Sequence, residues 1–201
     1  VRNMLYEIAH FLRDKMTWLW DMVEVLNSFL FTIRYGRRLR SISGEGVIIK
    51  GLPSKFKIVP IREIPTEQLV EFFARQPEEA YRFFKPHGLD VKSIKKLQRN
   101  KAFLAYVLLD GQRISGYCFN RSFFHGKGFR GRMVDIDYRG MGLGTMMNKI
   151  LNEVGFGIGL RLFETVNKDN IASYRSAMSA SNVRILEELE GKDLYLEILK
   201  V

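Results

Sequence analysis

The sequence predicts a single α+β domain, in which a mixed and mostly antiparallel β-sheet is flanked by helices, with an N-terminal amphipathic helical extension. A chain of 201 residues, 46% of them hydrophobic, is long enough for one large core and an appendage. Short apolar runs lie on either side of Asp110-Gly111 and of residues 191–193, as the strands of antiparallel hairpins do. Between these hairpins, an apolar segment at 129–135 leads through a glycine-rich loop into a helix-forming segment at 145–154.

The N-terminal extension is predicted to be one long helix. Residues 3–35 contain neither proline nor glycine, and large apolar residues recur at helical spacing. The members of this apolar face are Leu5, Ile8, Leu12, Met16, Leu19, Val23, Leu26, Leu30 and Ile33. A face this wide needs a partner. We favour the domain itself or a second copy in a homodimer, and the alternative is peripheral contact with a membrane, aided by the arginines of segment 34–40.

The helix carries too many charges to cross a bilayer or to act as a secretory signal. Its apolar run is interrupted well short of the ~20 residues that a spanning helix requires, by Arg13, Asp14, Lys15, Asp21 and Glu24. Glycines then recur through residues 36–55, which predicts a linker with one short strand at 47–49. We therefore divide the chain into an extension and linker, 1–55, and a domain, 56–201.

The elements of the domain follow from apolar periodicity and turn residues. A strand is predicted at 56–61, and helices at 66–84 and 91–100, with a break in the first helix at Pro77. The remaining predictions are strands at 103–109, 114–119 and 129–135, a helix at 145–154, a strand at 160–166, a helix at 170–181, and a closing hairpin of 183–190 and 194–199.

The glycine-rich loop at 139–144 is the strongest functional signal. Alternate glycines let backbone N–H groups approach a ligand, and the helix behind them adds unpaired donors and the positive end of its dipole. Phosphate suits such a site. A Walker loop is excluded because Gly144 is followed by Thr145 and Met146 rather than by Lys-Ser/Thr. A Rossmann loop is disfavoured because it belongs early in a chain, before any antiparallel strands.

Arg139, Gly142 and Gly144 fill the pattern Arg/Gln-x-x-Gly-x-Gly/Ala. This segment resembles motif A of the GNAT superfamily of acetyl-CoA-dependent N-acyltransferases. A second block at the expected distance is similar to the family's next strand and the start of its next helix, and consists of Leu162, Val166, Asn167, Lys168, Asp169, Asn170 and Ser173. The resemblance covers residues 57–200 and implies the GNAT fold, with a strongly bent sheet.

The resemblance also implies where acetyl-CoA binds. Backbone amides of the loop would hold the coenzyme A pyrophosphate, with Thr145 donating a further hydrogen bond. The strand that carries Met133 and Val134 would splay from its neighbour and pair with the pantetheine. The residues expected at this site are Val134, Arg139, Gly140, Met141, Gly142, Leu143, Gly144, Thr145, Asn170 and Ser173.

The catalytic residues are less clearly marked. The tyrosine that many GNAT members place seven residues after the helix-opening asparagine is replaced by Ala177, so Tyr174, one turn earlier, is the candidate acid or else a core residue. Glu164 is the candidate base, because strand alternation puts it on the apolar face of Leu162 and Val166, where a carboxylate holds its proton more tightly. An ion pair with an arginine at the sheet face is an equally weighted alternative.

The amino-acid composition limits which cofactors, partners and compartments we expect. Cys118 is the one cysteine, which excludes an internal disulfide and favours a reducing, cytoplasmic compartment; on a strand it is better suited to the core than to carrying an acyl group. The three histidines show no ligand spacing, and we predict no metal. The net charge of +10 is spread along the chain without a recognition motif, so we predict no nucleic-acid partner.

These observations predict a cytoplasmic N-acetyltransferase, with peripheral membrane contact left open. It would transfer an acetyl group from acetyl-CoA directly to a primary amine of a small molecule or an amino-sugar nucleotide. Loss of the usual tyrosine leaves a second hypothesis, a catalytically idle acyl-CoA-binding module whose N-terminal helix recruits a partner or a membrane.

Overall fold

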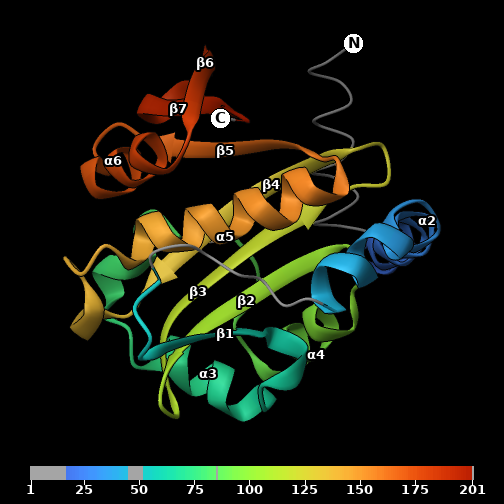
Figure 1. Ribbon diagram of the computed structural model, residues 1–201, viewed down its shortest axis with the longest axis horizontal. Coiled ribbons are helices and arrows are strands. Elements are labelled where there is room, and N and C mark those ends of the chain that lie inside the picture. Colours follow the sequence, from blue (N-terminus) through green and yellow to red (C-terminus); the bar gives the residue numbers. More distant parts are fainter. Residues whose placement is uncertain (1–16, 45–51, 85, 201) are drawn as a thin grey trace.

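The computed structural model describes residues 17–44, 52–84 and 86–200, and the account below concerns these residues (Figure 1). Its strands are β1 (Phe56–Pro60), β2 (Phe103–Asp110), β3 (Arg113–Ser122), β4 (Lys127–Val134), β5 (Arg161–Asn167), β6 (Asn182–Glu188) and β7 (Asp193–Leu199). Its α-helices are α2 (Thr17–Gly44), α3 (Thr66–Ala74), α4 (Val91–Arg99), α5 (Leu143–Ile158) and α6 (Ile171–Ala180). Short 3-10 turns are η1 (Ile61–Glu63), η2 (Glu78–Tyr81), η3 (Ile136–Tyr138) and η4 (Glu190–Lys192).

The seven strands form one mixed sheet in the order β1-β2-β3-β4-β5-β7-β6. Every neighbouring pair is antiparallel except β4 and β5. The turn between β2 and β3 holds Gly111 at a φ of 59°, the left-handed conformation for which the Asp-Gly pair was the sequence signal. The predicted mixed, mostly antiparallel sheet flanked by helices is confirmed.

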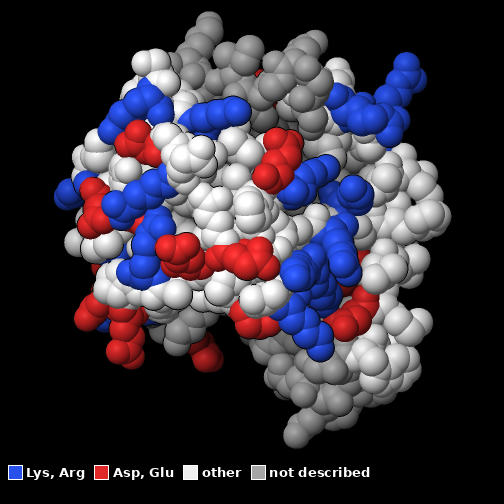
Figure 2. Space-filling view, turned by 90° about the horizontal axis from the view of Figure 1, so that it is seen from below, with Lys and Arg blue, Asp and Glu red and all other residues white. Residues whose placement is uncertain are grey.

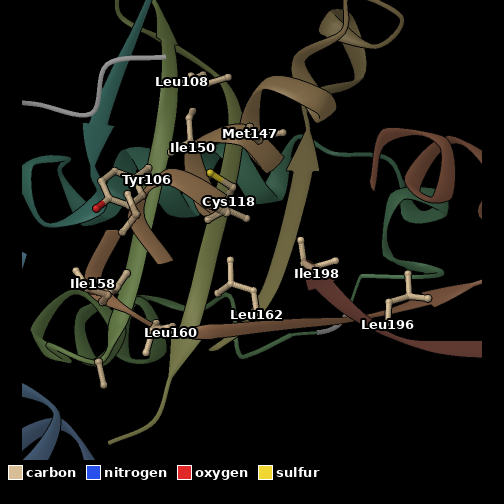
Figure 3. Packing of buried hydrophobic residues seen from close by; sticks show 14 of the residues in the cluster. Tyr106, Leu108, Cys118, Met147, Ile150, Ile158, Leu160, Leu162, Leu196 and Ile198 are labelled. Carbon is tan, nitrogen blue, oxygen red and sulfur yellow. The ribbon is translucent and has the colours of Figure 1, made fainter. Parts of the chain in front are cut away.

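Helices cover both faces of the sheet (Figure 1). On one face, α5 buries Met147, Ile150 and neighbouring side chains against Tyr106 and Cys118 of the central strands (Figure 3). On the other, α3 and α4 bury a second cluster around Phe72. The central strand β2 contributes side chains to both clusters, which explains why it shows six consecutive buried residues.

The N-terminal helix differs from its prediction at its C-terminal end. The sequence placed a linker from residue 36, but α2 continues through Gly36 to Gly44. This second part is held by packing, because Tyr35 is buried and Leu39 and Ile42 contact the core cluster beneath α5. Predicted features at residues 1–16 and the short strand at 47–49 lie outside the described residues.

Proline and glycine mark the ends of the domain helices. The stretch predicted as a helix at 66–84 is broken as expected, because α3 ends at Ala74 and only the 3-10 turn η2 follows Pro77. The helix after the glycine loop is longer than predicted. It ends where Gly159 adopts a left-handed φ of 90° and its N–H bonds back to the last turn.

Candidate active site

The parallel pair β4 and β5 opens into a fork. The strands are paired only from Lys127↔Arg161 to Phe129↔Phe163, and they diverge beyond this point. A cleft of about 1330 Å³ occupies the opening and extends to the N-terminal ends of α5 and α6. Beyond Phe129, the backbone groups of β4 that point toward β5 are therefore available to a ligand that enters the fork.

The glycine loop closes one end of this cleft. Gly140 and Gly142 both have left-handed backbones, with φ of 77° and 76°, and Gly142 caps the N-terminus of α5. A Cβ built on either glycine would meet no atom of the described chain within 4 Å apart from its sequence neighbours. The loop therefore needs glycine for its shape, and it presents backbone rather than side chains to the cleft at a helix N-terminus.

Gly144 has an additional role. It lies inside the first turn of α5, and a Cβ at this position would lie 3.0 Å from the Oγ atom of Ser176 on α6. The close approach of the two helices thus favours glycine here, because any side chain would force Ser176 to shift. The sequence pattern alone assigned this glycine to ligand approach.

Nine of the ten residues predicted to contact acetyl-CoA line the cleft: Val134, Arg139, Gly140, Gly142, Leu143, Gly144, Thr145, Asn170 and Ser173. Met141 is the exception, and its side chain is exposed. Asn170 caps α6, and its Oδ1 atom accepts a hydrogen bond from the backbone N–H of Ser173 at 3.1 Å. The cleft also takes in Arg175 of α6, which no motif had marked.

The cleft is also lined by residues that sequence reasoning missed: Glu79, Ala80, Arg82, Phe83 and Phe84. They belong to η2 and the segment after it. No periodicity or motif distinguishes this segment, and only the fold brings it to the fork.

A buried ion cluster bridges the fork where backbone pairing stops. Glu164 of β5 accepts from Nε of Arg130 and, at 3.3 Å, from Nη1 of Arg132, both on β4. All three side chains are almost fully buried, and they line the cleft. Arg130 also donates to Asn152 at 2.6 Å, and Arg132 to the carbonyl of Ser173 at 2.7 Å. The cluster therefore ties β4, β5, α5 and α6 together.

The surroundings of Glu164 differ from the predicted ones. The carboxylate is buried as expected, but its neighbours are two guanidinium groups rather than apolar side chains. Burial lowers the pKa of the Arg130 guanidinium, and the charge of Glu164 opposes that shift. The alternative of an ion pair with arginine is the arrangement observed.

The other catalytic candidates lie away from the cleft lining. Tyr174 is half-buried and packs against the core cluster, and Ala177, at the position of the usual tyrosine, is fully buried. Cys118 is buried in the same core (Figure 3), and burial raises the pKa of its thiol to about 12. A thiol that stays protonated is no acyl-carrying nucleophile. Among the described residues, no group of three His, Cys, Asp or Glu side chains is arranged to hold a metal ion.

Asp135 anchors the start of the glycine loop. Its buried carboxylate accepts from Nε of Arg75 at 2.8 Å, from the Gln76 amide at 2.9 Å and from Arg113 at 3.2 Å. It also accepts from the backbone N–H of Asp137 at 3.1 Å. This residue therefore fixes the end of β4 and the entry to the loop against α3 and β3.

We expect Asp135→Asn to lower the free energy of unfolding at neutral pH by about 2 kcal/mol. The substitution removes the charge of a buried carboxylate that pairs with two partly exposed arginines. Burial raises the pKa of Asp135, but hydrogen bonds from Gln76 and Arg75 outweigh this and leave the pKa below its usual value. The stabilisation is therefore complete above pH ~4 and is lost as the pH falls through the folded-state pKa.

Urea unfolding between pH 7 and pH 2.5 tests this prediction. The variant should lose less stability in acid than the parent protein does. Asp137→Asn is the matched control, because Asp137 is exposed and shares Arg113. Equal effects of the two substitutions would contradict the anchoring role.

No protein-family model and no curated protein matches the sequence. The fold of the chain, however, matches that of solved structures. The GNAT domain of PAT from S. lividans matches with a TM-score of 0.62 at 18% identity, over 71% of this chain and 89% of that one. The N-acetyltransferase PseH of Campylobacter jejuni in complex with acetyl coenzyme A matches with a TM-score of 0.55 at 14% identity, over 73% and 99%.

A third match is a spermidine N-acetyltransferase, a SpeG chimera from Vibrio cholerae and hSSAT, with a TM-score of 0.55 at 16% identity over 73% of this chain and 96% of that one. Each of these three matches covers more than two thirds of this chain. The chain has the fold of the GNAT acetyltransferases, as its two sequence motifs predicted.

Proposed function

We propose that the protein is an N-acetyltransferase that transfers an acetyl group from acetyl-CoA directly to a primary amine of a small molecule or an amino-sugar nucleotide. The observation that carries the proposal is the glycine loop, whose left-handed Gly140 and Gly142 present open backbone to the cleft at the N-terminus of α5. Such a site suits a pyrophosphate. The structure of PseH, which has a similar fold, is that of a complex with acetyl coenzyme A.

Different parts of the cleft suit the two substrates, acetyl-CoA and the amine acceptor. The loop, Thr145 and the start of α6 would hold the coenzyme A diphosphate, with Arg139 and Arg175 close by to balance its charge. Val134, beyond the last residue of β4 that pairs with β5, would offer backbone groups to the pantetheine amides. Acetyl-CoA supplies the activated acyl group, so the protein needs only to position the amine and polarise the carbonyl.

The wall formed by residues 79–84 would bind the acceptor. It carries both signs of charge, in Glu79 and Arg82, and two aromatic rings, Phe83 and Phe84. Carboxylates attract an amine, a guanidinium pairs with phosphate, and aromatic faces pack on sugar or base rings. This combination supports a small polar acceptor such as an amino sugar linked to a nucleotide. The SpeG chimera is a spermidine N-acetyltransferase, so the fold also accommodates a polyamine acceptor in that protein.

In the reaction, the neutral amine nitrogen attacks the thioester carbonyl, the C–S bond breaks, and the amine proton ends on the departing thiolate. The candidates for handling that proton are Glu164 and Tyr174. Glu164 lines the cleft but is shared by two arginines, whereas Tyr174 packs against the core. The position of Glu164 in the cleft lining makes it the better supported candidate of the two.

Release of free thiol in the presence of amines separates this proposal from its alternative, an idle acyl-CoA-binding module. We expect thiol release from acetyl-CoA with at least one acceptor in a panel of spermidine, an aminoglycoside and amino-sugar nucleotides, measured with a thiol-reactive dye. The buried Cys118 should contribute little background. If calorimetry shows that acetyl-CoA binds but no amine releases thiol, the idle module is the better description.

A further inference from the structure

The helix α2 is apolar on two sides, and only one of them faces the domain. On the domain side, Phe31 and Tyr35 are buried in the main core. The Asn27 side chain donates to the carbonyl of Ser122 at 2.9 Å and accepts from the N–H of Phe124 at 3.0 Å. The helix is therefore docked firmly, and its other side has a fixed orientation.

The second side carries what we call the apolar stripe: Trp18, Met22, Val25, Leu26, Phe29 and Ile33. Each of these side chains is between 57% and 68% exposed. Their spacing of three or four residues aligns them along one face over about 22 Å of helix. A continuous exposed row of this size is an interaction surface rather than the scattered exposure that is usual for surface residues.

Positive charge continues the apolar stripe. At 100° per residue, Arg40 falls in line with the stripe and Arg37 at its border, and both are exposed. The acidic residues of α2 lie on its flank and are already paired: Lys96 of α4 contacts Asp21 at 2.5 Å and Glu24 at 2.7 Å. Figure 2 shows an uncharged area along the right-hand edge, the side on which α2 lies in Figure 1, with basic side chains near it.

We propose that the apolar stripe, with Arg37 and Arg40, docks the protein on an anionic lipid surface. Large apolar side chains, one of them tryptophan, would enter the headgroup region, and the arginines would meet lipid phosphates and carboxylates. A second copy of the chain fits less well, because its stripe offers no carboxylate to those arginines. No described helix is long and apolar enough to cross a membrane.

This attachment leaves the cleft accessible. Arg38 donates to the carbonyl of Ile158 at 3.2 Å, so α2 meets α5 at its C-terminal end. The glycine loop lies at the other end of that 16-residue helix, about 24 Å away along its axis. Docking through α2 and binding of acetyl-CoA are therefore separable, and the proposal does not depend on the proposed function.

Co-sedimentation of the full chain with vesicles tests the proposal. We expect binding to vesicles of phosphatidylcholine with about one third phosphatidylserine, weaker binding to phosphatidylcholine alone, and loss of binding as salt is raised. Phe29→Glu should reduce partitioning at least about tenfold. Ile185→Glu is the control, because Ile185 is 53% exposed on the edge strand β6, which lies well apart from α2 (Figure 1).

Two further measurements test the contribution of the arginines and the insertion of the apolar stripe into the lipid separately. Arg37→Glu with Arg40→Glu should weaken binding to the anionic vesicles, whereas Lys57→Glu, an exposed charge reversal on β1, should not. In a Trp20→Phe background, Trp18 fluorescence should shift to shorter wavelength when vesicles are added. No sedimentation with anionic vesicles, or equal sedimentation of Phe29→Glu, would overturn the proposal. So would a lipid-free dimer that Phe29→Glu converts to monomer, which would assign the stripe to a second copy.

Discussion

Gly142→Asp is expected to reduce acetyl-CoA affinity at least about 100-fold, or ~2.7 kcal/mol of binding free energy. The position has a left-handed φ of 76°, and its missing side chain would project into open space at the cleft. An aspartate there would place a carboxylate where the pyrophosphate is expected and would strain the backbone that aims the neighbouring N–H groups. Isothermal titration calorimetry on the folded variant measures the effect.

The chain offers a matched control for backbone strain. Gly111, in the β2–β3 turn, also has a left-handed φ, 59°, and open space around its missing side chain, but it does not line the cleft. Gly111→Asp should therefore cost similar stability and leave acetyl-CoA affinity unchanged. Gly142→Ala separates strain from charge and should have an intermediate effect. Full affinity in a folded Gly142→Asp protein would refute the assignment of the loop to an anion.

The second large effect is expected from Glu164→Gln, which should lower the free energy of unfolding by about 3 kcal/mol. The substitution leaves the buried guanidiniums of Arg130 and Arg132 without their carboxylate. Arg130 already has one amino group, Nη2, without a hydrogen-bond partner within the described residues, so the loss of the Glu164 carboxylate adds to an existing deficit of acceptors. Urea unfolding at pH 7 measures the loss.

Glu197→Gln is the comparison for this variant. Glu197 of β7 also accepts from two arginines, Arg161 and Arg184, but both of those side chains are largely exposed. Water can solvate them once the carboxylate is gone, so this substitution should cost about 1 kcal/mol or less. Equal costs at the two sites would show that burial of the fork cluster has no energetic consequence.

A double substitution separates the structural role of Glu164 from a proton-transfer role. Arg130→Met with Glu164→Leu removes the Arg130–Glu164 pair as a unit and should recover part of the stability, because Arg132 keeps its hydrogen bonds to Ser173. If the carboxylate handles a proton, turnover should remain low across the pH range while acetyl-CoA affinity is kept. Recovered turnover would assign Glu164 to holding the fork.

The sequence by itself determined most of the elements and the glycine loop that lines the cleft. Alternate glycines at 140 and 142 mark left-handed turns because other residues adopt that conformation only at a cost, and this rule is local. The Asp110-Gly111 hairpin and the break at Pro77 were predicted for similar local reasons. The resemblance to GNAT motifs then supplied the fold and the strand that splays from its neighbour, which local rules do not contain.

Other features were decided only by the tertiary structure. Strand alternation placed Glu164 on an apolar face, but its actual partners are 34 and 32 residues away on another strand. The 36–44 segment has the glycine and the charges of a linker, yet packing of Leu39 and Ile42 on the core keeps it helical. The place of residues 79–84 in the cleft lining and the packing of the half-buried Tyr174 on the core follow from how elements meet. Turns and periodicity depend on neighbours in the chain, whereas burial and ion pairing depend on which distant segments the fold brings together, and that information is not local.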